Sequence, residues 1–119
     1  LGHTFGHAIE NLAGYGDYLH GEAIGLGLAM AGELSFRLGN ISEEEVKRIC
    51  QLVSRYSLPV TMDRPLDVNA LLGAMKRDKK VLKGTLRFVA LEQIGQAIII
   101  PEVESGLVRE ILVKFGASE

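Results

Sequence analysis

The sequence lacks the features that mark several special classes of protein. It has a single cysteine, Cys50, which excludes an internal disulfide and fits a reducing compartment. Its longest apolar run, residues 23–32, is about half of what a bilayer span needs, so no transmembrane segment is expected. The net charge of −2 provides no electrostatic footprint for nucleic acid or an anionic membrane. We therefore expect a cytoplasmic protein with no nucleic-acid partner and no membrane partner.

Two further features are absent. There is no initiating methionine and no signal peptide, and a chain of this kind is expected to be a fragment or a processed domain. There is also no glycine-rich turn between a strand and a helix, because Gly25-Leu26-Gly27 falls inside a predicted helix. We therefore expect that the chain does not bind NAD well by itself.

The residues that are present predict one mainly α domain over residues 1–119. The 47% apolar and 24% charged content is that of a globular protein with one core. Apolar periodicity predicts about six helical segments and one small β-hairpin, with Pro101 closing the hairpin and Ser105 capping the last helix. The ranges expected after the first helix are 18–38, 43–56, 68–77 and 105–115 for helices, and 85–91 and 97–100 for strands.

The second predicted helix is unusually rich in glycine. Gly21, Gly25, Gly27 and Gly32 each cost about 0.5–1 kcal/mol of helix stability relative to alanine. A helix that tolerates this cost is expected to be packed closely by its neighbours. We therefore predict that it is the central buried helix, and that the first helix crosses it near His20.

All three histidines lie within the first 20 residues. Drawn as a helix, the start of the chain places His3, His7 and Glu10 on one face, and His20 arrives from the next helix. The apolar side chains lie on the opposite face, namely Phe5, Ile9 and Leu12. Two imidazoles one turn apart can share a metal ion, or can combine one ligand with one proton-transfer group. Spacing alone leaves open that the histidines are structural.

Four segments of the chain resemble the C-terminal half of 3-dehydroquinate synthase, in order and with similar gaps from Leu1 to about Leu112. They are Gly2-His3-Thr4-Phe5-Gly6-His7-Ala8-Ile9-Glu10, then Tyr15-Gly16-Asp17-Tyr18-Leu19-His20-Gly21-Glu22-Ala23, then Arg77-Asp78-Lys79-Lys80-Val81, and finally Leu86-Arg87-Phe88-Val89 with Ile94-Gly95.

The resemblance implies a role for each matching residue. His3 and His20 would be zinc ligands, and His7 would be the active-site histidine that contacts substrate. A lysine of the Asp-Lys-Lys segment would reach the anionic substrate, and we favour Lys79 over Lys80. Without the resemblance, this charge run is typical of a solvated helix end. The family's third zinc ligand, a glutamate, and an arginine and an asparagine that contact substrate, fall upstream of the first residue.

The resemblance also implies an activity for the complete enzyme. It would convert 3-deoxy-D-arabino-heptulosonate 7-phosphate, a sugar-acid phosphate, into 3-dehydroquinate and phosphate in the shikimate pathway. It would use Zn²⁺, with Co²⁺ as the alternative metal, and NAD⁺ held mainly by an N-terminal α/β domain that this chain lacks. The full-length enzyme is expected to be a homodimer, and the chain alone to be inactive.

Three alternatives remain at this point. Other sugar-phosphate cyclases, of the deoxyinosose or valiolone type, share the two-histidine zinc arrangement and the NAD cycle. Iron-dependent alcohol dehydrogenases and glycerol dehydrogenases have a related fold and also use histidine ligands. A helical interaction domain with structural histidines would have no catalysis at all. The Gly-His-Thr-Phe-Gly-His and His-Gly-Glu segments favour the cyclases over the dehydrogenases, and a metal titration separates all of them from the interaction domain.

Overall fold

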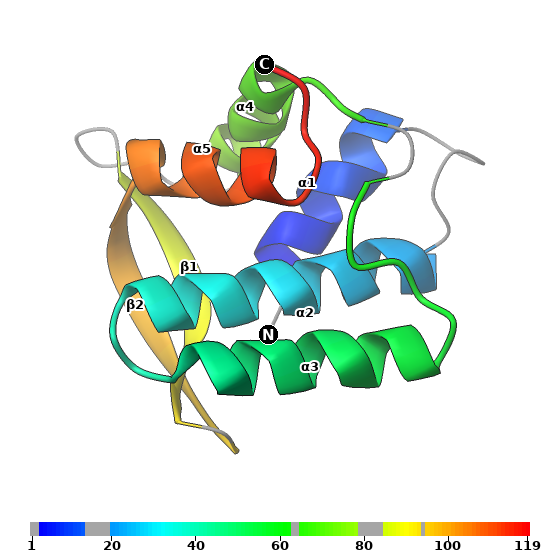
Figure 1. Cartoon of the computed structure of the whole chain (residues 1–119). Helices are drawn as coiled ribbons and strands as arrows, with labels where there is room; N and C mark the ends of the chain where they lie inside the picture. Colours follow the sequence, from blue (N-terminus) through cyan, green and yellow to red (C-terminus); the bar gives the residue numbers. More distant parts are fainter. Residues whose placement is uncertain (1–2, 14–19, 63–64, 79–84, 94) are drawn as a thin grey trace.

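The computed structural model describes residues 3–13, 20–62, 65–78, 85–93 and 95–119. Within these residues there are five helices, and a two-stranded hairpin lies along one side of them (Figure 1). Their order is α1 (His3–Ala13), α2 (His20–Arg37), α3 (Glu43–Arg55), α4 (Val68–Asp78), β1 (Thr85–Gln93), β2 (Gln96–Glu104) and α5 (Ser105–Lys114). The mainly helical class with one small hairpin is confirmed. No helix in the described ranges is long and apolar enough to cross a membrane.

Helix α2 is the centre of the fold, as its glycine content predicts. Of its 18 residues, 11 are buried, and α1, α3, α5 and β1 all pack against it. The largest fully buried side chains come from four helices, namely Phe5, Ile9, Leu26, Met30, Leu34, Val68, Leu71, Met75, Val108, Ile111 and Leu112. They form one core that fixes the relative positions of α1 and α2.

Two glycines of α2 permit close packing by elements other than α1. A Cβ atom on Gly25 would lie 3.1 Å from the Leu58 Cβ, and one on Gly32 would lie 3.1 Å from the Ile49 Cδ1. These glycines of α2 therefore admit α3 and the segment after it. The approach of α1 depends on its own Gly6, where a Cβ would lie 2.9 Å from the Ile24 Cδ1.

The predicted ends of the helices are confirmed at α3 and revised at α5. Ser42 and Glu45 form a capping box, with the Glu45 N–H donating to the Ser42 Oγ at 3.2 Å and the Ser42 N–H donating to the Glu45 Oε1 at 3.0 Å. The cap predicted at Ser105 is wrong, because Ser105 is already the first residue of α5. Strand β2 continues to Glu104, which occupies the N-cap position with extended backbone and no side-chain cap.

The hairpin is longer than the sequence predicts, since Pro101 lies inside β2 instead of ending it. Phe88 pairs with Ile100, and Leu86 pairs with Val103, so one residue of β1 faces two of β2. Proline has no N–H to donate to a strand ladder and is tolerated where the ladder is interrupted. The irregular register therefore accommodates Pro101.

The buried hydroxyl of Ser35 attaches the hairpin to α2. Ser35 Oγ donates to the Ala31 carbonyl at 2.8 Å and accepts from the Leu91 N–H at 2.8 Å. The Asn40 Nδ2 donates to the carbonyl of the same Leu91 at 3.0 Å. Both backbone groups of Leu91 are thereby paired with side chains of the α2 region, which places β1 against the central helix.

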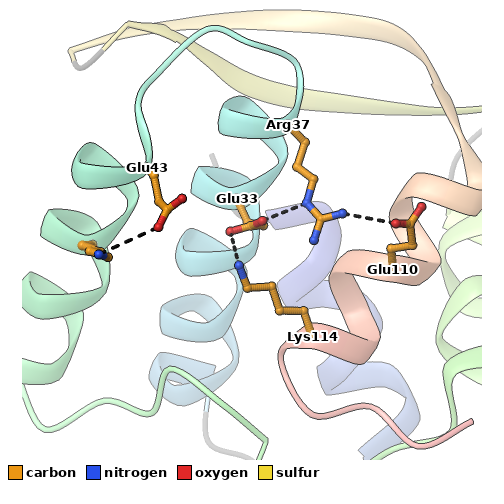
Figure 2. A network of polar contacts seen from close by, with 6 residues as sticks. Glu33, Arg37, Glu43, Glu110 and Lys114 are labelled. Carbon is orange, nitrogen blue, oxygen red and sulfur yellow. Dashed lines mark hydrogen bonds and ion pairs between the residues drawn. The ribbon is translucent and has the colours of Figure 1, made fainter.

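A buried carboxylate links α2 to α5. Figure 2 shows Glu33 between two cations, with its Oε2 accepting from the Arg37 Nε at 2.8 Å and its Oε1 accepting from the Lys114 Nζ at 3.0 Å. Arg37 also reaches Glu110 of α5 at 3.3 Å. Burial raises the pKa of Glu33, but the hydrogen bonds and charges of Lys114 and Arg37 outweigh this effect, and the pKa lies below its ordinary value.

We expect Glu33→Gln to lower the free energy of unfolding of the 119-residue chain by about 1–3 kcal/mol. The reason is that the buried carboxylate, and with it the charged hydrogen bonds to Arg37 and Lys114, is lost. The Glu33 pKa is lower in the folded chain than in the unfolded one. Its carboxylate therefore stabilises the fold above the unfolded pKa, and this contribution disappears as the pH falls through the folded pKa.

Urea unfolding at neutral and acidic pH checks this prediction. The difference between wild type and Glu33→Gln should shrink as the solution is acidified below the ordinary glutamate range. Glu44→Gln, at an exposed position of α3, is the matched control and should stay within about 0.5 kcal/mol of wild type. A difference that is constant with pH would show that the charge of Glu33 does not stabilise the fold.

Candidate metal and substrate site

Helix α1 separates apolar from polar side chains as its sequence predicts. Phe5 and Ile9 are 1% and 0% exposed, whereas His7 is exposed and Glu10 is partly exposed. His3 is the first residue of α1, and its side chain lies outside the described part of the structure. The apolar face holds the helix against the core, and the polar face carries His7 and Glu10 outward.

His20, the first residue of α2, lies against this polar face. Its Nδ1 is 3.0 Å from the Oε2 of Glu10, and the side chains are 68% and 29% exposed, respectively. The packing of α1 on α2 therefore brings a histidine of the second helix to the first one, as predicted. The residue that meets His20 there is Glu10.

The contact determines which nitrogen of His20 is available to a ligand. A carboxylate oxygen can only accept a hydrogen bond, so the Nδ1 carries the hydrogen when the two groups are bonded. In the neutral ring the lone pair then lies on Nε2. Histidine ligands of zinc commonly donate their second N–H to a carboxylate in this way. The Nε2 of His20 is therefore a nitrogen of the kind that binds zinc.

The remaining predicted site residues are the two lysines after α4 and His3 at the start of α1. Lys79 and Lys80 lie outside the described residues, directly after α4, which packs against α1. His3 precedes Glu10 by seven residues, or about 10 Å along the helix axis. Among the described residues, no group of three or more histidine, cysteine, aspartate or glutamate side chains could hold a metal ion. A metal shared by His3 and His20 therefore stays a prediction.

A hollow elsewhere in the described part of the chain offers no comparable chemistry. It has a volume of about 420 Å³ and lies between α3 and α5, where Glu33, Cys50 and Lys114 contribute to its wall. Glu33 and Lys114 are already paired with each other. Burial, together with the charge of Glu33, raises the pKa of the Cys50 thiol, which keeps it protonated and poorly nucleophilic. Neither His7 nor His20, the two histidines whose side chains are described, lines this hollow.

Sequence comparison shows which protein family the histidine-containing segment belongs to. The family model described as 3-dehydroquinate synthase C-terminal matches residues 1–81. A 3-dehydroquinate synthase of Opitutus terrae is 47% identical over 118 residues, which are 99% of this chain and 33% of that protein. One of Acinetobacter baumannii is 49% identical over 114 residues, which are 95% of this chain and 31% of that protein. The chain thus spans about a third of the length of these curated relatives.

Solved structures share the fold at lower sequence identity. A 2-deoxy-scyllo-inosose synthase complexed with carbaglucose-6-phosphate, NAD⁺ and Co²⁺ has a TM-score of 0.84 and 23% identity, over 96% of this chain and 34% of that one. A 2-epi-5-epi-valiolone synthase of Streptomyces hygroscopicus with NAD⁺ and Zn²⁺ bound has a TM-score of 0.80 and 24% identity, over 96% and 31%.

The chain therefore shares its fold with about a third of each of these two synthases. The family model matches residues 1–81, more than half of the chain, and the chain belongs to the family of 3-dehydroquinate synthase C-terminal domains. The resemblance that the sequence motifs indicated is confirmed, as is the fold class that it implied.

The sequence pattern did not reveal what Glu10 does. Helical periodicity placed Glu10 on the face of His3 and His7, and the first matching segment ends at Glu10, but neither gave it a partner. Its contact with His20 joins residues ten positions apart on two different helices. Periodicity describes one helix at a time, so it could not show this pairing.

Proposed function

We propose that residues 1–119 are the C-terminal metal- and substrate-binding domain of a 3-dehydroquinate synthase. The whole enzyme would convert 3-deoxy-D-arabino-heptulosonate 7-phosphate into 3-dehydroquinate and phosphate, in the shikimate pathway of the cytoplasm. The observation that carries the proposal is the family match over residues 1–81, because this segment contains all three histidines. The contact of His20 with Glu10 supports the proposal, because a hydrogen on Nδ1 leaves the lone pair of Nε2 to bind a metal ion.

The cofactors follow from the same proposal. We assign Zn²⁺, or Co²⁺, to His3 and His20, and NAD⁺ mainly to an N-terminal domain outside this chain. Two cyclases with this fold are described with NAD⁺ together with Co²⁺ or Zn²⁺, which supports a nucleotide and a divalent metal. The curated relatives are about three times as long as the chain, which leaves room for a nucleotide domain. The full-length enzyme is proposed to be a homodimer.

Each residue then has a physical task. The bound metal supplies a Lewis acid for negative charge that develops on a substrate oxygen. His20 presents its Nε2 while Glu10 holds its Nδ1, and His3 contributes from the first turn of α1. His7 is exposed on the same helix and is suited to hydrogen-bond a substrate oxygen and to move a proton near neutral pH. Lys79 or Lys80 pairs with an anionic group and positions the substrate.

A second candidate is another sugar-phosphate cyclase, since the solved structures with this fold are named for deoxyinosose and valiolone synthesis. Their identity to this chain is 23% and 24%, against 47% and 49% for the dehydroquinate enzymes. The larger identity favours the dehydroquinate reaction. Formation of 3-dehydroquinate from the heptulosonate phosphate, and not of 2-deoxy-scyllo-inosose or 2-epi-5-epi-valiolone, distinguishes the two.

We expect full-length protein containing this chain to release phosphate and form 3-dehydroquinate from the heptulosonate phosphate, with NAD⁺ and Zn²⁺ added. The isolated residues 1–119 should show no measurable turnover, because the third metal ligand and the nucleotide domain lie elsewhere. Phosphate release and product absorbance measured on both preparations check this. Turnover by the isolated chain would contradict the domain assignment, and an inactive full-length protein would contradict the proposed reaction.

A further inference from the structure

In the contact between Glu10 and His20, the core holds the backbone of one partner in place, whereas the side chain of the other is largely exposed. Glu10 lies one residue after Ile9, which is fully buried, and four residues after Gly6, whose missing Cβ lets α1 approach α2 closely. The backbone that carries Glu10 is therefore fixed by the core. His20 begins its helix and has a side chain that is 68% exposed.

This asymmetry indicates which residue positions the other. An exposed imidazole at the start of a helix can rotate about both side-chain torsions unless something holds it. The Oε2 of Glu10, 3.0 Å from Nδ1, restricts that rotation and selects the tautomer with the hydrogen on Nδ1. The other ring nitrogen, Nε2, is then directed away from Glu10 with its lone pair available.

We propose that Glu10 is a positioning residue that orients His20 for metal binding without touching the metal or the substrate. The inference rests on the proposed function, because it takes His20 as a metal ligand. It goes beyond that proposal by assigning a task to a residue outside the ligand set. Carboxylates that hold ligand histidines in this way typically change metal affinity by about 10–100-fold when they are replaced.

The alternative is that the pair is only a weak surface contact, worth about 0–1 kcal/mol in stability. The two explanations differ in what they predict for metal binding. A surface contact would change the thermal stability slightly and leave zinc affinity alone. A positioning contact would weaken zinc binding in a protein whose fold and NAD⁺ affinity are unchanged.

The test uses full-length protein and measures the zinc dissociation constant by competition with a chelator. We expect Glu10→Gln, which keeps the shape of the side chain and removes its charge, to weaken zinc binding by about 10–100-fold. Glu10→Asp keeps the carboxylate on a shorter side chain and should retain more of the affinity. Glu44→Gln removes the same charge from an exposed position on α3 and should match wild type.

Two further measurements separate the possible outcomes. The absorption spectrum of the Co²⁺-loaded protein should change in Glu10→Gln, since the orientation of a ligand ring has changed. The melting temperature and NAD⁺ affinity should match wild type, which shows that the fold is intact. Wild-type zinc affinity and an unchanged cobalt spectrum in Glu10→Gln would overturn the inference.

His20→Ala distinguishes failure of this inference from failure of the proposed function. If His20→Ala loses zinc while Glu10→Gln binds it normally, His20 is a ligand and only the role of Glu10 is wrong. If His20→Ala also binds zinc normally, then His20 is not a ligand, and the metal assignment and the inference fail together. The inference stands only when both substitutions weaken zinc binding, with the larger loss in His20→Ala.

Discussion

Replacing His20 with alanine should remove zinc from the full-length enzyme and lower its turnover by more than about 10⁴-fold. A missing acid or base typically costs about 10²–10⁴ in rate, and loss of a ligand costs more because the metal leaves as well. His3→Ala should behave in the same way. A catalytic zinc usually has three protein ligands, so removing either histidine leaves too few donors to retain it.

Metal analysis and steady-state kinetics on the same preparations check this prediction. Zinc content and turnover should fall together in both variants, while NAD⁺ affinity and the melting temperature show that the protein is still folded. Glu44→Gln, far from the histidines in sequence and on the exposed side of α3, is the control for a single surface substitution. Unchanged zinc stoichiometry in both histidine variants would remove His3 and His20 from the ligand set.

The helical part of the fold could be predicted because its determinants are local. The capping box of Ser42 and Glu45 requires only residues three apart, and it fixed the start of α3 correctly. The end of α5 is local as well, since Gly116, two residues after the helix, adopts a φ of 109° that favours glycine. A cost in helix propensity also indicated burial, since three of the four glycines of α2, Gly25, Gly27 and Gly32, are buried. The fourth, Gly21, is exposed near the start of the helix.

The parts that were predicted wrongly depend on pairing between distant segments. The length of β2 is determined by its register with β1, and a bulge opposite Leu86 and Phe88 accommodates Pro101. The cap expected at Ser105 failed for the same reason, because the longer strand occupies the residue before it. Which helix would approach which glycine of α2 also required the tertiary structure.

In the candidate site, too, the features within one helix could be predicted from the sequence and the contact between two helices could not. Periodicity correctly separated His7 and Glu10 from the apolar face of α1, because all of these residues belong to one helix. The meeting of Glu10 with His20 depends on how α1 crosses α2, and that crossing depends on Gly6, whose space is occupied by Ile24 and Ala23. The assignment of His3 and His20 to metal came from the family resemblance and still needs the measurement described above.

His7→Ala should keep zinc and NAD⁺ in the full-length enzyme but lower kcat by about 10²–10⁴-fold, the usual cost of removing a proton-transferring group. His7 follows His3 by one helical turn along α1, and its side chain is exposed. Such a position suits a group that touches a substrate bound to the metal. The family resemblance implies metal binding for His3 and His20, and we therefore assign proton transfer to His7.

Zinc analysis beside steady-state kinetics separates His7 from the ligands. His3→Ala is the matched control, because it removes an imidazole from the same helix, one turn away. If the division of roles is correct, His3→Ala is depleted of zinc, whereas His7→Ala is loaded with zinc and is slow. His7→Gln, which can still donate a hydrogen bond but cannot relay a proton at neutral pH, should be as slow as His7→Ala if proton transfer dominates. Loss of zinc from His7→Ala to the same extent as from His3→Ala would show that the pair one turn apart is the chelate, and that the roles along α1 are assigned wrongly.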